Sequence, residues 1–260
     1  MARVFITGSS DGLGLAAAAS LLQDGHSVVL HARNEQRAAD ARAELAQAET
    51  VLIGDLTSRA ETLDLAERAN QLGRFDAVIH NAAVGSSEQR RIATPEGHSH
   101  LLAINVLAPY ILTARMTRPR RLIYLSSGLH RYAEASLDDV DWVTRPWNAT
   151  QAYSESKLLD TAFAAALARR WPEVLSNSVE PGWVATKMGG ADAPDDLSLG
   201  HITQAWLAVS DDPGATVSGH HFYHQNERDR NPAATDPDFQ NALIHGLEAL
   251  TEIRLPEQVA

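Results

Sequence analysis

The chain has 260 residues, 44% of them hydrophobic and 21% charged, and a formal net charge of −11. This composition fits a soluble α/β domain, and the acidic balance argues against a nucleic-acid partner because a phosphate backbone would be repelled. The absence of cysteine excludes disulfides, thiolate nucleophiles and zinc–thiolate sites, and no segment reaches the ~18 apolar residues of a membrane span, so we expect a cytoplasmic protein without a membrane partner.

Short apolar runs alternate with helical patterns along the chain. Strands are expected at residues 3–8, 26–32, 50–56, 75–83, 120–127 and 174–182, and helices at 13–25, 35–48, 59–72, 98–116 and 151–171. Strands separated by helices are typical of parallel strands with crossovers, so the pattern predicts an α/β fold with a doubly wound parallel sheet in a single domain, 1–260. Residues 187–235 are rich in Gly, Pro, Asp and His and give the weakest pattern. Within them the segment "ERDRNPAATDPD" is expected to be an irregular surface loop, followed by a last helix near 236–251.

A glycine-rich loop, "FITGSSDGLGLA", joins the first strand to the first helix and carries Gly8, Gly12 and Gly14. Glycines at this place let the backbone approach a pyrophosphate, and the helix N-terminus supplies N–H groups and a positive dipole end. A tight structural turn is the alternative, but the strand-to-helix context favours nucleotide binding. No G-K-[ST] follows, which disfavours phosphoryl transfer.

The end of the second strand bears on the choice of nucleotide. An NAD site usually has an acid there, whereas this chain has Ala32 followed by Arg33. A guanidinium suits a 2′-phosphate, which favours NADP(H) and leaves NAD(H) as the second option. The alternative is a solvated arginine, and Asp11 and Glu35 weigh against the NADP(H) interpretation.

Tyr153 and Lys157 are four residues apart on an expected helix and therefore share one face. A tyrosine ordinarily keeps its proton up to about pH 10, and a nearby cation favours the phenolate. Lys157 is one of only two lysines in the chain, against 20 arginines. An ordinary helix pair is the alternative, but the scarcity of lysine favours acid–base chemistry.

Several ordered motifs resemble those of the short-chain dehydrogenase/reductase family. They are "TGSSDGLG" at 7–14, "GDL" at 54–56, "NAA" at 81–83, "INVLAPY" at 104–110, "YLSS" at 124–127, "YSESK" at 153–157 and "PGWVATKM" at 181–188. The resemblance covers about residues 2–190. It implies a Rossmann-type fold and an oxidoreductase that transfers hydride between a nicotinamide and a secondary alcohol, ketone or aldehyde.

The resemblance also implies roles for single residues. Tyr153 would be the general acid/base, and Lys157 would stabilise its phenolate and bind the nicotinamide ribose. Ser127 would bond the substrate carbonyl oxygen, and Asn105 would position a water that relays protons to Lys157. The implied cofactor-binding residues are Gly8, Ser10, Gly12, Leu13, Gly14, Arg33, Asp55, Leu56, Asn81, Ala82, Ala83, Tyr153, Lys157, Pro181, Gly182, Val184 and Thr186.

Three features depart from the family's common pattern. Ala83 replaces a glycine, and Ser127 and Tyr153 are 26 residues apart, about twice the usual spacing. The inserted segment, 128–151, resembles the longer loop of the retinol-dehydrogenase-like or WW-domain-oxidoreductase-like branch. The segment "LTARMTRPRRL" shortens the fifth helix, which puts the family's helix-mediated dimer interface in question and leaves a homo-oligomer open.

Several histidines raise the question of a metal site. His220, His221 and His224 belong to the segment "HHFYH", whose spacing could bring two imidazoles together, and His130 lies close to Tyr132 in the insertion. No carboxylate or cysteine partner is in register nearby, so we expect no metal and predict a final strand there instead.

The sequence predicts an NADP(H)-preferring oxidoreductase with a small-molecule carbonyl or alcohol substrate. A non-catalytic nucleotide-sensing scaffold is the alternative. The insertion and a substrate loop at 187–205 should wall the pocket, ahead of a C-terminal loop and helix at 225–260. Trp142, Trp147 and Trp183 favour a hydrophobic or aromatic substrate, although packing of the insertion onto the body is the better explanation of Trp142 and Trp147.

Overall fold

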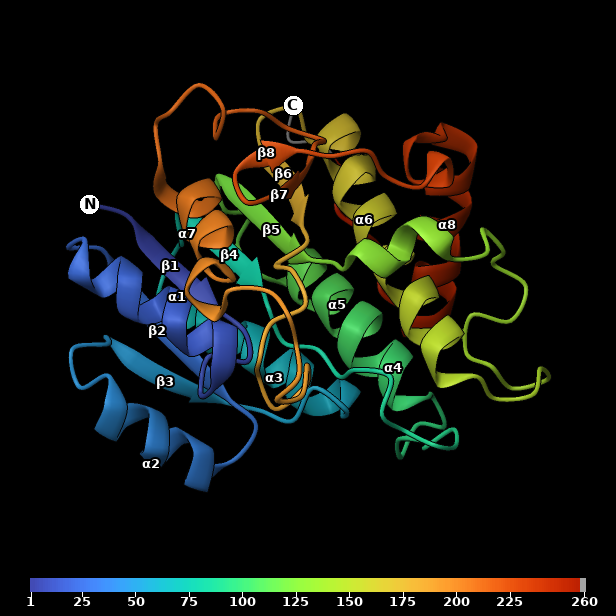
Figure 1. Cartoon of the computed structure of the whole chain (residues 1–260), viewed down its shortest axis with the longest axis horizontal. Helices are drawn as coiled ribbons and strands as arrows, with labels where there is room; N and C mark the ends of the chain where they lie inside the picture. The colour runs from blue at the N-terminus through green and yellow to red at the C-terminus, as the bar shows by residue number, and fades with distance from the viewer. Residues whose placement is uncertain (258–260) are drawn as a thin grey trace.

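Eight strands form one sheet in the computed structural model, which describes residues 1–257 (Figure 1). The order is β3-β2-β1-β4-β5-β6-β7-β8; the pairs from β3 through β7 are parallel, and β8 is antiparallel to β7. The strands are β1 Arg3–Ile6, β2 Ser27–Ala32, β3 Thr50–Ile53, β4 Ala77–His80, β5 Arg121–Leu125, β6 Leu175–Val179, β7 His221–Tyr223 and β8 Asn226–Glu227. The doubly wound parallel sheet predicted from the sequence is confirmed, and so is the strand expected at the histidines.

The helices mostly follow the predicted pattern. They are α1 Gly12–Gln23, α2 Glu35–Glu44, α3 Arg59–Gln71, α4 His100–Leu102, α5 Ala108–Arg115, α6 Ala149–Arg170, α7 Ile202–Val209 and α8 Pro237–Thr251. A π-helical turn, η1 Ala103–Leu107, joins α4 to α5, and 3₁₀ turns are η2 Gly128–Tyr132, η3 Leu197–Leu199 and η4 Pro232–Thr235. Helix α7 was not predicted, so the expected substrate loop, 187–205, ends in its first turn.

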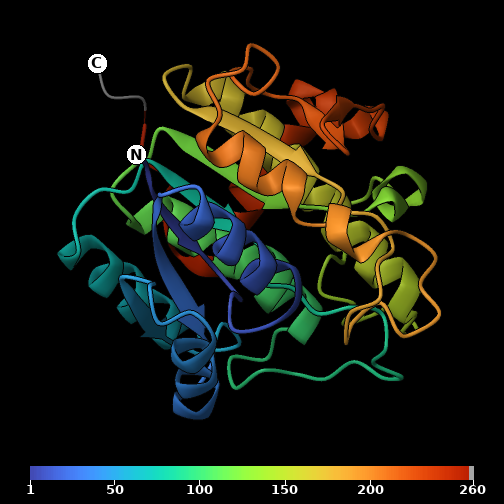
Figure 2. The same ribbon diagram turned by 60° about the vertical axis from the view of Figure 1, so that its left-hand side comes forward.

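Side chains that alternate along the strands separate the core into two layers. Val4 and Ile6 pack with α1, α2 and α7 on one face of the sheet, whereas Phe5 packs with α3, α5 and α6 on the other. Helix α8 lies outside α6, as both views show (Figures 1 and 2). Among the helices of residues 1–257, none combines the length and apolarity needed to cross a bilayer.

The C-terminal segment covers the outer face of the α5–α6 layer. Leu243, Ile244 and Leu247 of α8 belong to the same hydrophobic cluster as α5 and α6. Beyond α8, the Tyr110 hydroxyl donates to the Ile253 carbonyl at 2.8 Å, and the Trp171 indole N–H donates to a carbonyl of the same tail. The C-terminal segment is therefore held against α5 and the end of α6 by both apolar packing and hydrogen bonds.

The direction in which the chain adds strands reverses after β3: β2 and β3 lie on one side of β1, and β4 to β8 lie on the other. The switch point is therefore between β1 and β4. In open α/β sheets, ligands bind at such a switch point, outside the carboxyl ends of the strands. The residues predicted to bind cofactor follow these ends in turn, after β1, β2, β3, β4, β5 and β6. The topology thus brings segments far apart in the sequence to one edge of the sheet.

Candidate active site

A cleft of about 630 Å³ opens at this edge of the sheet. Most of the residues predicted to bind cofactor line it, namely Gly8, Ser10, Gly12, Leu13, Arg33, Asp55, Leu56, Asn81, Ala82, Ala83, Tyr153, Lys157, Pro181 and Thr186. Five predicted site residues lie just outside the described lining: Gly14, Asn105, Ser127, Gly182 and Val184. The size falls within the range typical of ligand pockets.

The glycine loop is built by close packing against the end of β4. Gly8 has a φ of +62°, and a Cβ there would lie 2.8 Å from the Ala82 Cα. A Cβ on Gly14 would lie 2.5 Å from the Asn81 side-chain nitrogen and 2.6 Å from the Gly8 carbonyl oxygen. A glycine is therefore needed at position 14 because α1 packs closely against this loop, not because the residue faces the cleft. Close packing of helix and strand is also the role of the third glycine in dinucleotide-binding folds.

Asn81 fastens the glycine loop to β4. Its side-chain N–H₂ donates to the carbonyls of Thr7 at 3.0 Å and Gly8 at 3.1 Å. Asp55, at the end of β3, accepts bonds from the backbone and hydroxyl of Thr57 through one carboxylate oxygen. Both residues border the cleft. The Asn81 amide is used in holding the loop, whereas the second carboxylate oxygen of Asp55 takes no part in the two bonds from Thr57.

His31 was missed from the sequence, although it is a polar residue in the apolar run of β2. Its Nδ1 accepts from the Gly8 N–H at 2.9 Å, which leaves Nε2–H to donate to the Gly54 carbonyl at 2.9 Å. Burial lowers the pKa of His31 to about 4, against an opposing contribution from that Gly54 bond. The neutral ring therefore links the loop after β1 to the end of β3 at neutral pH.

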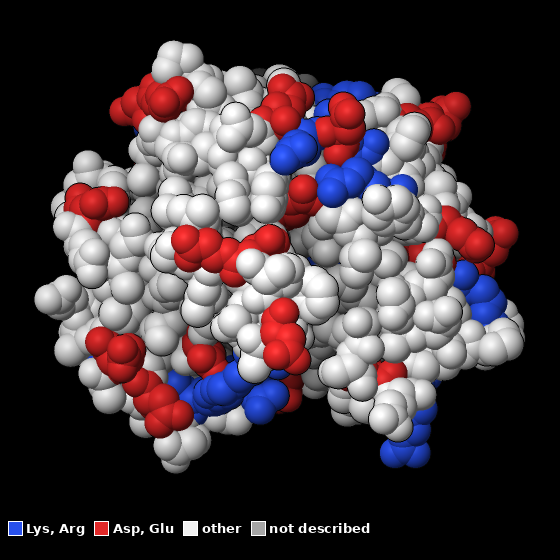
Figure 3. Space-filling model, in the orientation of Figure 1, with Lys and Arg blue, Asp and Glu red and all other residues white. Residues whose placement is uncertain are grey.

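The end of the cleft beside β2 is basic. Arg33, Arg37 and Lys187 line it together with Asp11. Asp11 caps α1 by accepting from the Gly12 N–H at 2.8 Å, and its other oxygen pairs with Lys187 and, at 3.4 Å, with Arg37. The bond from Lys187 holds the pKa of Asp11 below its usual range. On the face shown in Figure 3, Lys and Arg form a distinct patch among acidic and neutral groups.

Lys157 is the other lysine of the chain, and it lies in the same cleft as Lys187. It is only 2% exposed, and its Nζ lies 6.0 Å from the centre of the Tyr153 ring. The ammonium donates to the Leu125 carbonyl at 2.7 Å and to Asp160 Oδ2 at 2.8 Å. An ammonium has three N–H donors, so these partners use two and leave one for a ligand.

Asp160 is a second residue that the sequence reasoning missed. It lies three positions after Lys157 on α6, and its side chain is 5% exposed. Burial raises the pKa of Asp160 to about 6, although the ion pair with Lys157 lowers it. At neutral pH the carboxyl is therefore ionised and compensates the buried ammonium. The spacing on one helix face was the available signal.

The two serines after β5 have different environments. The Ser126 hydroxyl is buried and bonded to the Lys157 carbonyl at 3.0 Å and the Thr161 hydroxyl at 2.8 Å, so it ties β5 to α6. Ser127 is half-buried, and its oxygen accepts from the Leu129 N–H at 3.3 Å. Of the two, Ser126 is the one whose hydroxyl holds α6, whereas the role of Ser127 toward a substrate oxygen stays a prediction.

Asn105 lies in the middle of the π-helical turn η1. Its Oδ1 accepts from the Val84 N–H at 2.9 Å, and its Nδ2 donates to the Val84 carbonyl at 3.1 Å and the Ser156 hydroxyl at 3.0 Å. The side chain thus clamps the segment after β4 to α6. The predicted role of Asn105 in a proton relay to Lys157 stays a prediction, because its side chain is taken up by these bonds.

The insertion is fixed by its tryptophans. Trp142 is buried, donates from Nε1 to Glu155 at 3.0 Å, and has Arg145 stacked on its ring at 3.8 Å. Trp147 meets Trp142 edge-to-face at 5.9 Å, in a cluster that also includes Tyr153. The packing interpretation of these two rings is confirmed.

Trp183 does not enter the cleft. Its side chain is 60% exposed and donates from Nε1 to the Gly189 carbonyl at 2.8 Å. Met188 lies over the cleft instead, close enough to Gly85 that a Cβ there would come within 2.8 Å of it. A polar pair that no motif indicated, Glu88 and His100 at 3.1 Å, also lines this part of the cleft.

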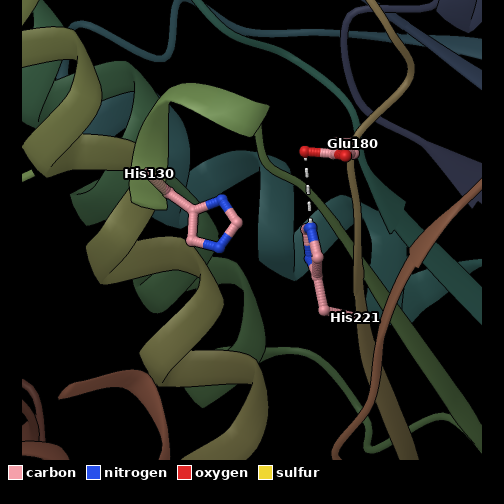
Figure 4. A group of neighbouring side chains, drawn as sticks. All are labelled: His130, Glu180 and His221. Atoms are coloured by element: carbon pink, nitrogen blue, oxygen red, sulfur yellow. Dashed lines mark ion pairs between the residues drawn. The ribbon is translucent and has the colours of Figure 1, made fainter. Parts of the chain in front are cut away.

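One premise about the histidines is wrong. Glu180 lies beside His130 and His221, so a carboxylate partner is present, in a cluster shown in Figure 4. It was missed because His221 and Glu180 meet only through the pairing of β6 with β7. His220 pairs separately with Glu227 at 2.7 Å, and Tyr132 is exposed.

Comparison with known proteins supports this picture. A family model described as short chain dehydrogenase matches residues 2–126. A protein of Emericella nidulans, named Uncharacterized oxidoreductase AN7799, is 41% identical over 98% of this chain and 99% of its own length. Human Retinol dehydrogenase 14 is 32% identical, over 72% of this chain and 62% of its own. The crystal structure of an uncharacterised protein from Mycobacterium paratuberculosis matches with a TM-score of 0.81 at 25% identity, over 98% of this chain and 95% of that one.

Proposed function

The chain belongs to the short-chain dehydrogenase family, since two fungal proteins named short-chain dehydrogenase are 40% identical to it over 98% of its length, and it is an NAD(P)-dependent oxidoreductase. From that premise we propose that it prefers NADP(H) and acts on hydrophobic ketones, aldehydes or secondary alcohols. The observation that carries the proposal is a single cleft that joins the glycine loop to Tyr153 and Lys157. A nucleotide bound along this cleft would have its phosphates at α1 and its far end at Tyr153.

The residues present fit a dinucleotide. Gly12 is exposed at the start of α1, and a Cβ there would have only the Thr186 methyl group within 4 Å, at 3.9 Å. The N-terminus of α1 is therefore open to a ligand, and the first-turn N–H groups of a helix have no intrahelical partner. Asp11 uses one of these groups, but its charge is offset by Lys187 and Arg37.

The bound nicotinamide would supply or accept the hydride at the carbonyl carbon. In reduction the Tyr153 hydroxyl gives its proton to the carbonyl oxygen, and in oxidation the phenolate takes it back. Lys157 stabilises that phenolate by its charge, and the third ammonium donor is available to a ribose hydroxyl. Ser127 would hold the substrate oxygen beside Tyr153.

The preference for NADP(H) is supported by the basic end of the cleft. Arg33 is exposed at the carboxyl end of β2, where NAD-binding folds usually have an acid, and Arg37 lies one helical turn further on. A guanidinium matches a phosphate with paired N–H bonds, so these arginines suit a 2′-phosphate.

The preference for an apolar substrate is supported by the loop after β6. Large hydrophobic residues are exposed along residues 183–202, namely Trp183, Met188, Leu197, Leu199 and Ile202. Met188 also lines the cleft, next to Val84 and Ile104. Closure of such a loop over a substrate would bury apolar surface, which favours a hydrophobic or aromatic compound.

The test is a turnover assay with NADPH and NADH against a panel of ketones and aldehydes, followed by the disappearance of the reduced nicotinamide. We expect turnover of lipophilic carbonyl compounds with NADPH. Tight NADPH binding without turnover of any member of the panel would support the nucleotide-sensing scaffold instead.

A further inference from the structure

Three buried side chains form a cluster on the far side of Ser127 from the cleft. One nitrogen or oxygen each of His130, Glu180 and His221 lies within 4.8 Å of the other two (Figure 4). The two histidines are 0% exposed and Glu180 is 6% exposed. The cluster is separate from the proposed nicotinamide site, since the described lining of the cleft includes none of the three.

Strand pairing places His221 beside Glu180. Ser178 of β6 lies opposite His221 of β7, and Glu180 follows Ser178 by two residues, so both point to the same side. The His221 Nδ1 is 2.9 Å from the Ser178 hydroxyl, and its Nε2 is 3.7 Å from Glu180 Oε2. The ring therefore bridges the two side chains of β6.

The turn η2 adds the third group. It begins directly after Ser127, and the His130 ring packs edge-to-face on His221 with 4.6 Å between centroids. The His130 Nδ1 lies 2.5 Å from the Ser127 carbonyl oxygen, which can only accept, so Nδ1 carries the proton and Nε2 the lone pair. This is the tautomer that a metal-binding histidine adopts when a backbone carbonyl orients it.

Both Nε2 atoms are buried and lack a hydrogen-bond partner within residues 1–257. The 3.7 Å separation of His221 from Glu180 is too long for a hydrogen bond. Buried polar groups normally have partners, so two adjacent nitrogens without one indicate a missing ligand.

We propose that His130, Glu180 and His221 bind one transition-metal ion of the Zn²⁺ type, with water in the fourth position. Two imidazoles and a carboxylate form a known zinc donor set, and imidazole selects against Mg²⁺ and Ca²⁺. Zinc bonds of about 2.0–2.2 Å place tetrahedral ligand atoms roughly 3.4 Å apart. The His221–Glu180 separation of 3.7 Å is close to this value. Since the three ligand atoms lie within 4.8 Å of one another, His130 has to approach by no more than roughly 1.4 Å.

The ion would hold the turn η2 against β6 and β7. Since His130 also donates to the Ser127 carbonyl, the ion would fix the backbone that presents Ser127 without touching the substrate. Arg131 opposes it, because its Nη1 donates to both Glu180 oxygens at 3.0 and 3.2 Å. Its side chain is 35% exposed, so water screens part of that charge.

The test uses full-length protein freed of any purification tag, stripped with a chelator and titrated with ZnCl₂ by calorimetry. Co²⁺ absorption should report tetrahedral nitrogen and oxygen ligands. We expect one ion per chain and, at about 100 times the dissociation constant, a rise in Tm of roughly 5–10 °C. His130→Gln and His221→Gln should each weaken Zn²⁺ by about 100-fold or more, and Arg131→Gln should tighten it.

His220→Gln is the matched control, because it removes the neighbouring imidazole, which pairs with Glu227 outside the cluster. It should leave Zn²⁺ affinity unchanged. Glu180→Gln keeps the shape of the side chain and serves if a histidine variant fails to fold. The proposal is overturned if the wild-type chain takes up no stoichiometric Zn²⁺, since a buried water would then be the occupant of the cluster. It is also overturned if the His130→Gln/His221→Gln double variant binds Zn²⁺ as well as the wild type does.

Discussion

The buried pair of Lys157 and Asp160 makes a strong prediction about stability. Replacing Asp160 by leucine removes the carboxylate and leaves the Lys157 ammonium 2% exposed with the Leu125 carbonyl as its remaining protein partner described above. An ammonium that is taken out of water needs a counter-charge. We therefore expect Asp160→Leu to destabilise the cofactor-free protein strongly at neutral pH.

The magnitude follows from the burial of both groups. Removing one partner of a buried ion pair typically costs about 3–5 kcal/mol, whereas replacing both by apolar groups is often neutral or stabilising. At roughly 2–4 °C per kcal/mol for a domain of this size, the single variant should lose roughly 6–20 °C in Tm. Lys157→Met should also destabilise, by leaving Asp160 unpaired, and the double variant should recover much of the loss.

The assay is a double-mutant cycle on the free energy of unfolding, measured by urea denaturation of the four cofactor-free proteins. A coupling energy of about 3 kcal/mol is expected, near the upper end for groups in contact. A coupling below about 0.5 kcal/mol would refute the argument, because it would mean that Lys157 does not depend on Asp160 for its place in the core. NADPH should stabilise the wild type and the Asp160→Leu variant alike if Lys157 keeps a donor for the ribose.

The same pair gives a pH dependence whose sign is fixed by linkage. Burial raises the pKa of Asp160 to about 6, above the 3.8 usual for an aspartate, so the folded protein binds this proton more readily than the unfolded chain. The contribution of Asp160 to the free energy of unfolding therefore falls as pH rises through 6, by at most about 1.4 kcal/mol per pH unit. The free energy of unfolding of the wild type, taken relative to that of the non-titrating variant Asp160→Asn, should rise as the pH is lowered from about 7 to about 5; a relative fall over this range would contradict the assignment.

Three further predictions concern activity. Tyr153→Phe should bind NADPH nearly as well as the wild type, by fluorescence titration, and lose about 10²–10⁴-fold in kcat, because it removes the proton donor; turnover within a factor of two would exclude Tyr153 as the acid/base. Arg33→Ala should weaken NADPH far more than NADH, since only the former carries the 2′-phosphate, with the exposed Arg42 of α2 as the matched control; equal losses for both nucleotides would end this interpretation of Arg33. In a kcat/KM series, alkyl-aryl ketones and lipophilic aldehydes should exceed charged sugars and small polar acids, and the reverse order would remove the apolar-pocket proposal.

The sequence predicted the parts of the fold that local pattern controls. The first six strands are short apolar runs, some of them followed by glycine, and the segments between them are rich in helix-forming residues, so the type of each element follows from local pattern. Helix α7 was missed because it is only eight residues long, and its N-cap, His201, makes no side-chain capping bond. Such a helix is stabilised by packing of Ala205, Leu207 and Ala208 against the sheet rather than by local signals.

The candidate site divides in the same way. The glycine loop and the Tyr153–Lys157 pair are contiguous motifs, and the structure brings them to one cleft. His31 and Glu180 contact residues that are distant in the sequence, and Asp160 contacts Lys157 one turn away on the same helix face. No contiguous motif marks any of the three. Glu180 reaches His221 across 41 residues only because β6 pairs with β7, so no spacing rule could have joined them.

The two lysines both line the cleft, and each is paired with an acid. Lys157 is buried and paired with Asp160, whereas Lys187 is exposed and paired with Asp11. In a chain that otherwise uses arginine, both sites need a cation that can keep one partner while it accepts another. An ammonium on a flexible stem rotates three equivalent donors, whereas a guanidinium offers a fixed planar fork. Lysine at both positions therefore lets a ligand be added to an existing ion pair instead of requiring that the pair be broken.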